Sequence, residues 1–449
     1  MKYFYILLNV LVANIFAQTN TAFDSFLLSE QVKPASVSFL VYNVCQNKYI
    51  VNYKTDKLMV PASVQKLVTT SAALNILTED FKFVTKINLL GEIIENRFIG
   101  VIEVVASGDP TLNETLIEEI YDFLSAKNIN SIEGYITVKE NVFDNAFPQT
   151  WLVEDIANYY GSPAYSFNYL KNTYKLTFTQ TAEGLNPKIK SISPYMRKLN
   201  FENNLVSGSE KSGDHAYILG LPFSNERQIV GTIPAGTGTF SIKGAINNPA
   251  QIFKNDLIKK FQKENFKFIY NKDVKKAKVI ETLIHESNEL TKIINTTNKK
   301  SINLYAEALL KMIAYKKYGF GTTENGIKAL KKYYNDESLI IYDGSGLSRK
   351  DLITANFVNK ILLTNKENKV FKNSLGISGV SGTMKYFKSD KTRGKIYAKS
   401  GSADNILNFA GYFKNSKGEE FTFVIFINNY LGDRKFLRKE IVKLMEYFL

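Results

Sequence analysis

The sequence predicts an α+β fold in which one antiparallel sheet with helices carries a large β-rich insertion. Near the start of the chain, two strand-like runs flank a short polar turn and predict a hairpin at 36–43 and 49–53. Near the end, three more such runs could join this hairpin in one sheet, at 395–399, 408–413 and 421–428. Between them, strand-like runs alternate with glycine, asparagine and serine turns, which indicates an insertion at 81–285.

Apolar residues at helical spacing predict the helices. The first follows Ser63, and Pro61 suits its entry. Further helices are expected at 288–295, 302–318, 354–364 and 433–449. In the last of these, Phe436 and five other apolar residues should share one face that docks on the core. Strands of the insertion are expected at 98–105, 135–139, 174–179, 216–221 and 228–233.

The composition bounds the function. The chain has 449 residues, 45% of them hydrophobic, and a formal net charge of +14. Its lysines are scattered, so a solvated basic surface is favoured over a nucleic-acid site. Two histidines cannot build a three-histidine zinc site, and the sequence indicates no metal or other cofactor. The single cysteine, Cys45, excludes an intramolecular disulfide, and we expect it to be buried as a small hydrophobe.

The N-terminus has the pattern of an export signal at 1–17. Lys2 precedes an apolar stretch that is short for a membrane span, and a polar run follows Ala17. No other window is apolar enough to cross a membrane, so the mature chain is expected to be exported, with the periplasm as its compartment. The remaining chain then divides into the first part of the sheet domain at 18–80, the insertion at 81–285 and the second part at 286–449.

Ser63 and Lys66 are the first candidate catalytic residues. They lie three residues apart at the start of a helix, which brings the lysine amine within reach of the serine hydroxyl. A serine needs an adjacent base to become a good nucleophile, and a lysine can act as that base if it is held neutral. The chain contains no other Ser-x-x-Lys. The alternative is an exposed lysine one turn after a helix-capping serine.

Two more short motifs follow. Ser301 and Asn303 open a helix, where serine commonly serves as a cap, or they could turn a hydroxyl and an amide into a cleft. Lys399-Ser400-Gly401 ends a strand. It could be an ordinary strand end, or the glycine could let a substrate backbone lie along the strand while the lysine and serine bind a carboxylate.

Taken in order, the three motifs resemble the signature of the penicillin-recognising serine enzymes. The chain is similar to the low-molecular-mass penicillin-binding proteins of the D-alanyl-D-alanine carboxypeptidase/endopeptidase type, peptidase family S13. The resemblance spans about 22–449 and has a long insert typical of this branch. Besides the motifs it rests on Ser107–Leu112, Trp151–Asp155 with Tyr160–Gly161, Ser301–Glu307, Asp343–Arg349, Gly382–Met384, and Lys399–Ser402 through Ala410–Tyr412. Where the family usually has Lys-Thr-Gly, Ser400 keeps the hydroxyl and loses a methyl group.

The resemblance implies a transpeptidase-like fold and a mechanism without a cofactor. Its expected ligands are peptidoglycan stem peptides and β-lactams, with no nucleic acid. Ser63 would attack, Lys66 would accept the proton, and Ser301 and Asn303 would complete the catalytic set. Lys399, Ser400, Gly401 and Ser402 would bind substrate, and Asp155 matches a family position that can meet the amine of a diamino-acid side chain.

Two other functions remain open from the sequence. One is a β-lactamase with the same chemistry and faster deacylation, against which the insert and the 343–349 block argue. The other is a non-catalytic wall-binding scaffold, against which the presence of all three motifs argues. The balance of carboxypeptidase and endopeptidase activity, the wall cross-link and the oligomeric state are not predicted.

Overall fold

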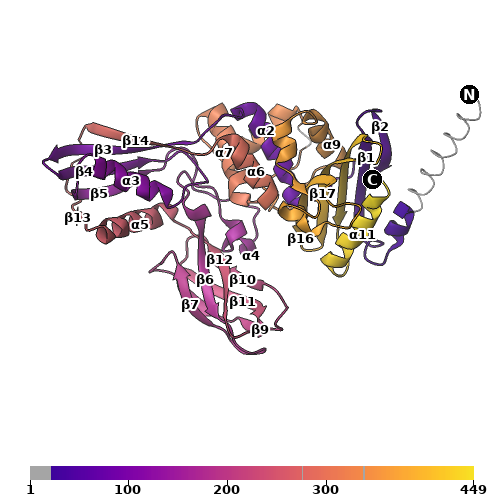
Figure 1. Ribbon diagram of the computed structural model, residues 1–449, viewed down its shortest axis with the longest axis horizontal. Helices are drawn as coiled ribbons and strands as arrows, with labels where there is room; N and C mark the ends of the chain where they lie inside the picture. The colour runs from indigo at the N-terminus through magenta and orange to yellow at the C-terminus, as the bar shows by residue number, and fades with distance from the viewer. Residues whose placement is uncertain (1–21, 276, 337–338) are drawn as a thin grey trace, which may run out of the picture. The chain divides into compact units, whose positions relative to one another are not determined.

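The computed structural model describes residues 22–275, 277–336 and 339–449, and the expected signal at 1–17 lies outside them. Two compact units are present (Figure 1). The first holds the described residues up to Asn75, together with Ile294–Ile302 and Leu330–Leu449. The second holds Ile76–Ile293 and Asn303–Ala329, so it also takes in a stretch that the sequence places in the sheet domain. No helix among the described residues is both long and apolar enough to cross a membrane.

The first unit is built on a six-stranded sheet in the order β15-β16-β17-β18-β1-β2, with every pair antiparallel. The N-terminal hairpin joins the C-terminal strands, because β1 pairs with β18 from Ser36↔Asn428 to Asn43↔Phe421. This confirms the single antiparallel sheet predicted from the sequence. The strands are β1 (Ser36–Asn43), β2 (Lys48–Tyr53), β15 (Gly376–Ile377), β16 (Ile396–Ala403), β17 (Ile406–Lys414) and β18 (Glu420–Asn428).

The two faces of this sheet are covered by different helices. On one face, α11 (Arg434–Glu446) packs Leu437 and Ile441 into a cluster with phenylalanines and isoleucines of the strands. On the other, Tyr412 Oη donates to Leu362 O of α9 (Ala355–Thr364) at 2.7 Å. The remaining helical elements of this unit are η1 (Ala62–Gln65), α2 (Lys66–Leu77), α10 (Lys369–Asn373) and η4 (Gly382–Tyr386), with parts of α6 (Leu290–Lys300) and α8 (Thr323–Tyr334).

Two side chains are more exposed than the sequence predicts. Phe436 is 53% exposed, because the buried stripe of α11 runs through Leu437 and Ile441 and Phe436 lies beside it. Cys45 is exposed as well. It lies in the turn after β1, beyond the last residue of the strand. Burial was expected because in the sequence Cys45 continues the alternating apolar residues of that strand.

The second unit contains a mixed sheet in the order β13-β5-β4-β3-β14, in which β5 runs parallel to β4 and to β13. Parallel neighbours need crossover connections, and α3 and α5 supply them; both pack in the core of this unit (Figure 1). The sequence analysis did not predict these two helices. The elements are β3 (Val84–Ile94), β4 (Arg97–Val105), α3 (Thr115–Ala126), β5 (Ser131–Lys139), α5 (Pro249–Lys263), β13 (Lys267–Tyr270) and β14 (Val279–Glu286).

Two smaller sheets complete the β-rich part of the second unit. One has the order β12-β6-β7, and the other has the order β10-β11-β8 with β9 also paired to β11. Their strands are β6 (Thr173–Thr179), β7 (Lys188–Ser193), β8 (Asn200–Asn203), β9 (Val206–Gly208), β10 (His215–Leu219), β11 (Glu226–Pro234) and β12 (Thr239–Ala245). The helical elements α4 (Val153–Ile156), η2 (Tyr159–Gly161), η3 (Leu170–Asn172) and α7 (Asn303–Tyr318) also belong to this unit.

Candidate active site

Ser63 lies in the one-turn helix η1, and Lys66 is the first residue of α2. Lys66 Nζ donates to Ser63 Oγ at 2.9 Å and to Ser345 O at 2.7 Å. The lysine side chain is fully buried. The two side chains therefore meet as their spacing predicts, and a neutral Lys66 could take the hydroxyl proton directly.

The turn that carries Ser63 is held against the sheet by asparagines. Asn408 Nδ2 donates to Val60 O at 2.8 Å and to Pro61 O at 3.0 Å. Val60 N–H in turn donates to Asn428 Oδ1 at 2.9 Å. These bonds fix the backbone just before Ser63, so the serine sits on a support built from β17 and β18. The sequence analysis did not single out either asparagine.

Gly401 has a structural use that differs from the one expected. A Cβ at this position would lie 2.5 Å from Pro61 O and 3.1 Å from Ser63 N. The missing side chain therefore makes room for the backbone of η1, where the sequence analysis expected room for a substrate backbone. β16 and the Ser63 turn can pack this closely only with glycine at position 401.

Replacing Gly401 with alanine is expected to slow acylation of Ser63 by about 100-fold. The added Cβ would push η1 away from β16 and change the position of Ser63 relative to Lys66. The melting temperature should fall as well, since overpacking costs about 1–3 kcal/mol. Labelling by a fluorescent penicillin and thermal unfolding measure the two effects. Gly238→Ala is the matched control, because its Cβ would meet only Gln180 Oε1 at 3.4 Å. Equal labelling rates in both variants would contradict this prediction.

The 343–349 block shapes the loop that contacts Lys66. The buried carboxylate of Asp343 accepts backbone N–H bonds from Ser345 at 3.1 Å, Gly346 at 2.6 Å and Ser348 at 2.8 Å. This tight turn presents Ser345 O to Lys66 Nζ. Gly346 has φ +78°, and a Cβ there would lie 1.9 Å from Ala62 O. Asp343 is thus a positioning residue that sequence reasoning missed, although an aspartate before Gly-Ser-Gly is a typical turn signal.

Lys399 forms another lysine–serine contact, close to that of Lys66 and Ser63. Its Nζ donates to Ser301 Oγ at 2.9 Å and to Ser400 O at 2.7 Å. Complete burial, and to a smaller extent the charge of Lys66, hold the pKa of Lys399 well below its usual range. A charge on either ammonium therefore disfavours a charge on the other. Ser301 adopts φ +56°, a conformation that is uncommon outside glycine and often found at functional sites.

The residues around Lys399 extend this polar cluster along β16. Ser400 Oγ donates to Thr383 Oγ1 in η4 at 2.7 Å. Ser402 is exposed at the end of the strand, opposite Leu407 of β17. The first unit thus brings together Ser63, Lys66, Ser301 and Lys399–Ser402. Thr383 joins them without having been given a role from the sequence.

Asn303 and Asp155 lie in the second unit. Asn303 is the first residue of α7, and its Nδ2 donates to Tyr160 O at 2.8 Å. Asp155 is a buried residue of α4. Burial, and next the Asp155 carboxylate, raise the pKa of the Tyr160 hydroxyl. The structure therefore ties Asn303 to the segment that carries Asp155.

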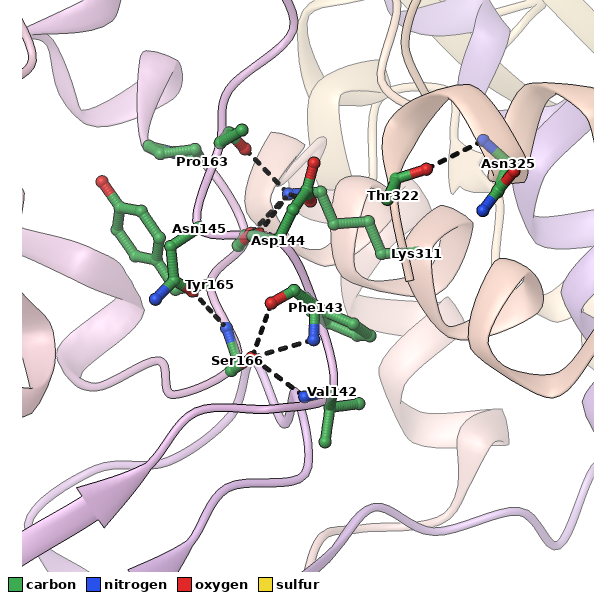
Figure 2. Close-up of polar contacts among 12 residues, drawn as sticks. Val142, Phe143, Asp144, Asn145, Pro163, Tyr165, Ser166, Lys311, Thr322 and Asn325 are labelled. Carbon is green, nitrogen blue, oxygen red and sulfur yellow. Dashed lines mark hydrogen bonds and ion pairs between the residues drawn. The ribbon is translucent and has the colours of Figure 1, made fainter. Parts of the chain in front are cut away.

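A buried lysine secures both ends of that segment to α7 (Figure 2). Lys311 Nζ forms an ion pair with Asp144 Oδ1 at 2.8 Å and donates to the carbonyl oxygens of Asp144 at 3.1 Å, Ala146 at 2.8 Å and Ala164 at 2.8 Å. Ser166 Oγ adds bonds to the backbone of Phe143 (Figure 2). Burial lowers the pKa of Lys311, and the Asp144 charge opposes that shift. Lys311 thus supports the Asp155 segment from within the second unit.

Metal ligands are not grouped in the described part of the chain: no three His, Cys, Asp or Glu side chains there could hold a metal ion together. The sheet of the first unit, and the order of the three motifs along the chain, define the class of penicillin-recognising serine enzymes. More narrowly, the chain belongs to the D-Ala-D-Ala carboxypeptidase 3 (S13) family, whose profile matches residues 19–448.

Similar proteins support the assignment to the S13 family. The chain is 25% identical over 416 residues to the D-alanyl-D-alanine carboxypeptidase DacB of Haemophilus influenzae, covering 88% of this chain and 86% of the relative. The crystal structure of penicillin-binding protein 4 (dacB) from the same organism matches with a TM-score of 0.77 and 22% identity, over 96% of this chain and 99% of the other. Its complex with a β-lactam matches with a TM-score of 0.75 and 22% identity, over 94% and 97%. The structural likeness confirms the α+β transpeptidase-like fold.

Proposed function

We propose that this protein is a serine-type D-Ala-D-Ala carboxypeptidase that cleaves peptidoglycan peptides through an acyl-enzyme on Ser63. The observation that carries the proposal is the 2.9 Å contact between Lys66 Nζ and Ser63 Oγ in a chain of the S13 family. Family membership supports the substrate class, and the contact supports the assignment of nucleophile and base.

Ser63 Oγ is proposed to attack the carbonyl carbon of the penultimate D-alanine while Lys66 Nζ accepts the hydroxyl proton. The backbone N–H groups of Ser63 and Ser402 would stabilise the oxyanion. When the C–N bond breaks, a proton from Lys66 reaches the leaving amine by way of Ser301, whose hydroxyl contacts Lys399. Water then attacks the ester, which releases the shortened peptide and restores the Ser63 hydroxyl.

Substrate binding is assigned to the neighbouring motifs. Lys399 and Ser400 would hold the terminal carboxylate, and Gly401 would lie beside it. Asn303 would orient the peptide through its amide, with Asp155 as the partner for the amine of a diamino-acid side chain. The 2.8 Å bond from Asn303 Nδ2 to Tyr160 O supports a fixed orientation of that amide.

Endopeptidase activity follows from the same chemistry. An amide that cross-links two stems differs from a terminal one only in what the leaving amine carries, so Ser63 and Lys66 could cleave both. Such a substrate implies export to the periplasm, where peptidoglycan is found. β-Lactams would acylate the same serine and stop at that stage. The complex of the Haemophilus influenzae protein with a β-lactam supports binding of this class of inhibitor.

Mass spectrometry after incubation with a labelled penicillin tests the proposal. A stable adduct on the peptide that contains Ser63 is the expected result. Rapid release of hydrolysed penicillin would instead indicate a β-lactamase, and no adduct at all would indicate a non-catalytic scaffold. Digestion of purified cell wall then separates the two peptidase activities, because released D-alanine reports carboxypeptidase action and loss of dimeric muropeptides reports endopeptidase action.

A further inference from the structure

A cavity of about 560 Å³ lies within the first unit, formed by α10, the start of β16 and the paired ends of β17 and β18. Its volume falls within the range of small-ligand sites, about 300–1,000 Å³. Four lysines and one glutamate in its lining give a net charge of +3, and aromatic rings lie among them. The charged members are Lys369, Lys372, Lys395, Lys414 and Glu420.

The single negative charge in this lysine pocket is already paired. Lys372 Nζ lies 2.5 Å from Glu420 Oε1 and 4.9 Å from the centre of the Tyr412 ring. The other three lysines are exposed, and within the described residues none of them forms an ion pair with a carboxylate. Three ammonium groups are thus available to bind an anionic ligand. A chain that carries several carboxylates would fit these charges better than a neutral molecule would.

The lysine pocket shares a face of β16 with the catalytic cluster. Ile396 and Ala398 point into the apolar cluster beneath α11, so Tyr397 and Lys399 point to the opposite face. Two residues along a strand span about 7 Å. Tyr397 lines the pocket and is 37% exposed, while Lys399 contacts Ser301. A ligand in the pocket would therefore lie close to the residues proposed to bind the scissile peptide.

We propose that the lysine pocket binds a second, carboxylate-bearing stem peptide of the same wall polymer whose D-alanyl bond is cleaved at Ser63. This inference rests on the proposed function. Peptidoglycan presents stem peptides at short intervals, each with free carboxylates and alkyl side chains that can pack on aromatic rings. Holding one stem raises the effective concentration of its neighbour at the serine. Binding should therefore help hydrolysis of wall and cross-linked fragments, and leave small isolated substrates unaffected.

The test is a charge reversal of the three available lysines, Lys369→Glu, Lys395→Glu and Lys414→Glu, in one variant. On insoluble wall and on a soluble cross-linked muropeptide dimer, KM should rise about tenfold with kcat little changed. With a short N-acylated peptide that ends in D-Ala-D-Ala and has no other carboxylate, kcat/KM should stay at the wild-type value. The difference between variant and wild type should shrink in about 0.5 M salt, because the interaction is electrostatic.

A matched control reverses three exposed lysines on the far side of the sheet, Lys33, Lys435 and Lys439, which changes the net charge equally. This control should hydrolyse wall like the wild type. Equal loss in both triple variants, or equal loss on the short peptide, would overturn the proposal. A stem tripeptide without D-Ala-D-Ala should inhibit wall hydrolysis by the wild type and not by the pocket variant. If inorganic polyphosphate competes and the tripeptide does not, the pocket serves a phosphate polymer and the proposal fails.

The outcome is separable from the proposed function itself. If wild-type protein forms no penicillin adduct on Ser63 and does not cleave the short peptide, the proposed function is wrong whatever the pocket binds. If both reactions proceed and only the dependence of KM on the three lysines is missing, the second-stem site alone is wrong.

Discussion

Ser63→Ala is expected to lower peptide hydrolysis by about 10⁴-fold or more and to abolish covalent labelling by penicillin. The variant removes the hydroxyl that accepts a hydrogen bond from Lys66 Nζ at 2.9 Å. No other Ser-x-x-Lys in the chain could replace it. When a nucleophile and its base act together, loss of the nucleophile alone costs nearly as much activity as loss of all the catalytic residues. This is the basis for the expected loss of about 10⁴-fold. Steady-state hydrolysis of a D-Ala-D-Ala peptide and mass spectrometry measure the two effects.

The fold should survive this change, since Asn408 and Asn428 hold the preceding backbone without help from the Ser63 side chain. An unchanged melting temperature would show that lost activity does not reflect unfolding. Ser36→Ala is a suitable matched control, because that serine opens β1 and its hydroxyl accepts from Lys57 Nζ rather than from Lys66. Hydrolysis by Ser63→Ala above about a thousandth of the wild-type rate would refute the assignment of the nucleophile.

The local parts of the structure were the easiest to predict from the sequence. Strand-like apolar runs identified β1 and β18, and the spacing of Ser63 and Lys66 predicted a contact between their side chains. Both depend on backbone periodicity, which a single segment displays. The same reasoning failed at Cys45, which lies beyond the end of β1, and at Phe436, which lies beside the buried stripe of α11.

Contacts between distant segments could not be read in this way. Nothing in the sequence near position 401 indicates that Pro61 O would lie against it, although that approach is what requires the glycine. Asp343 likewise acts on Lys66 through a loop almost 280 positions further along the chain. Helices α3 and α5 were missed because the insertion was predicted as strands alternating with turns. The parallel pairs of β5 with β4 and β13 instead need helical crossovers.

Burial of a charged group at the site implies a cost in stability, and Lys399 is where we expect to measure it. The pKa of Lys399 is held well below its ordinary value of 10.5 by burial and, secondarily, by Lys66. Between the lowered pKa and 10.5, the unfolded chain binds more protons than the folded chain. Stability must then rise with pH across this window, by at most about 1.4 kcal/mol per pH unit from this one group.

Lys399→Met should therefore leave the protein as stable as the wild type at pH 7, or more stable, while hydrolysis falls by about 100- to 1,000-fold. Methionine fills similar volume without a charge, and replacing buried ionic groups with apolar ones is often neutral or stabilising. Activity falls because the variant loses the amine proposed to bind the terminal carboxylate and the contact with Ser301. The unfolding free energy, measured at pH 7 and pH 9.5, should differ less between these pH values in the variant than in the wild type.

Lys311→Met is the matched comparison, because Lys311 is also a buried lysine with a lowered pKa. Its surroundings differ: it has a carboxylate and three carbonyl oxygens as partners, where Lys399 has a second cation nearby. Removing Lys311 takes the donor away from these acceptors, of which the Ala164 carbonyl is buried, and should cost about 3 kcal/mol. If Lys399→Met destabilises the protein as strongly as Lys311→Met, then Lys399 is primarily a structural lysine. In that case, the burial of Lys399 beside Lys66 would not indicate an active site that trades stability for function.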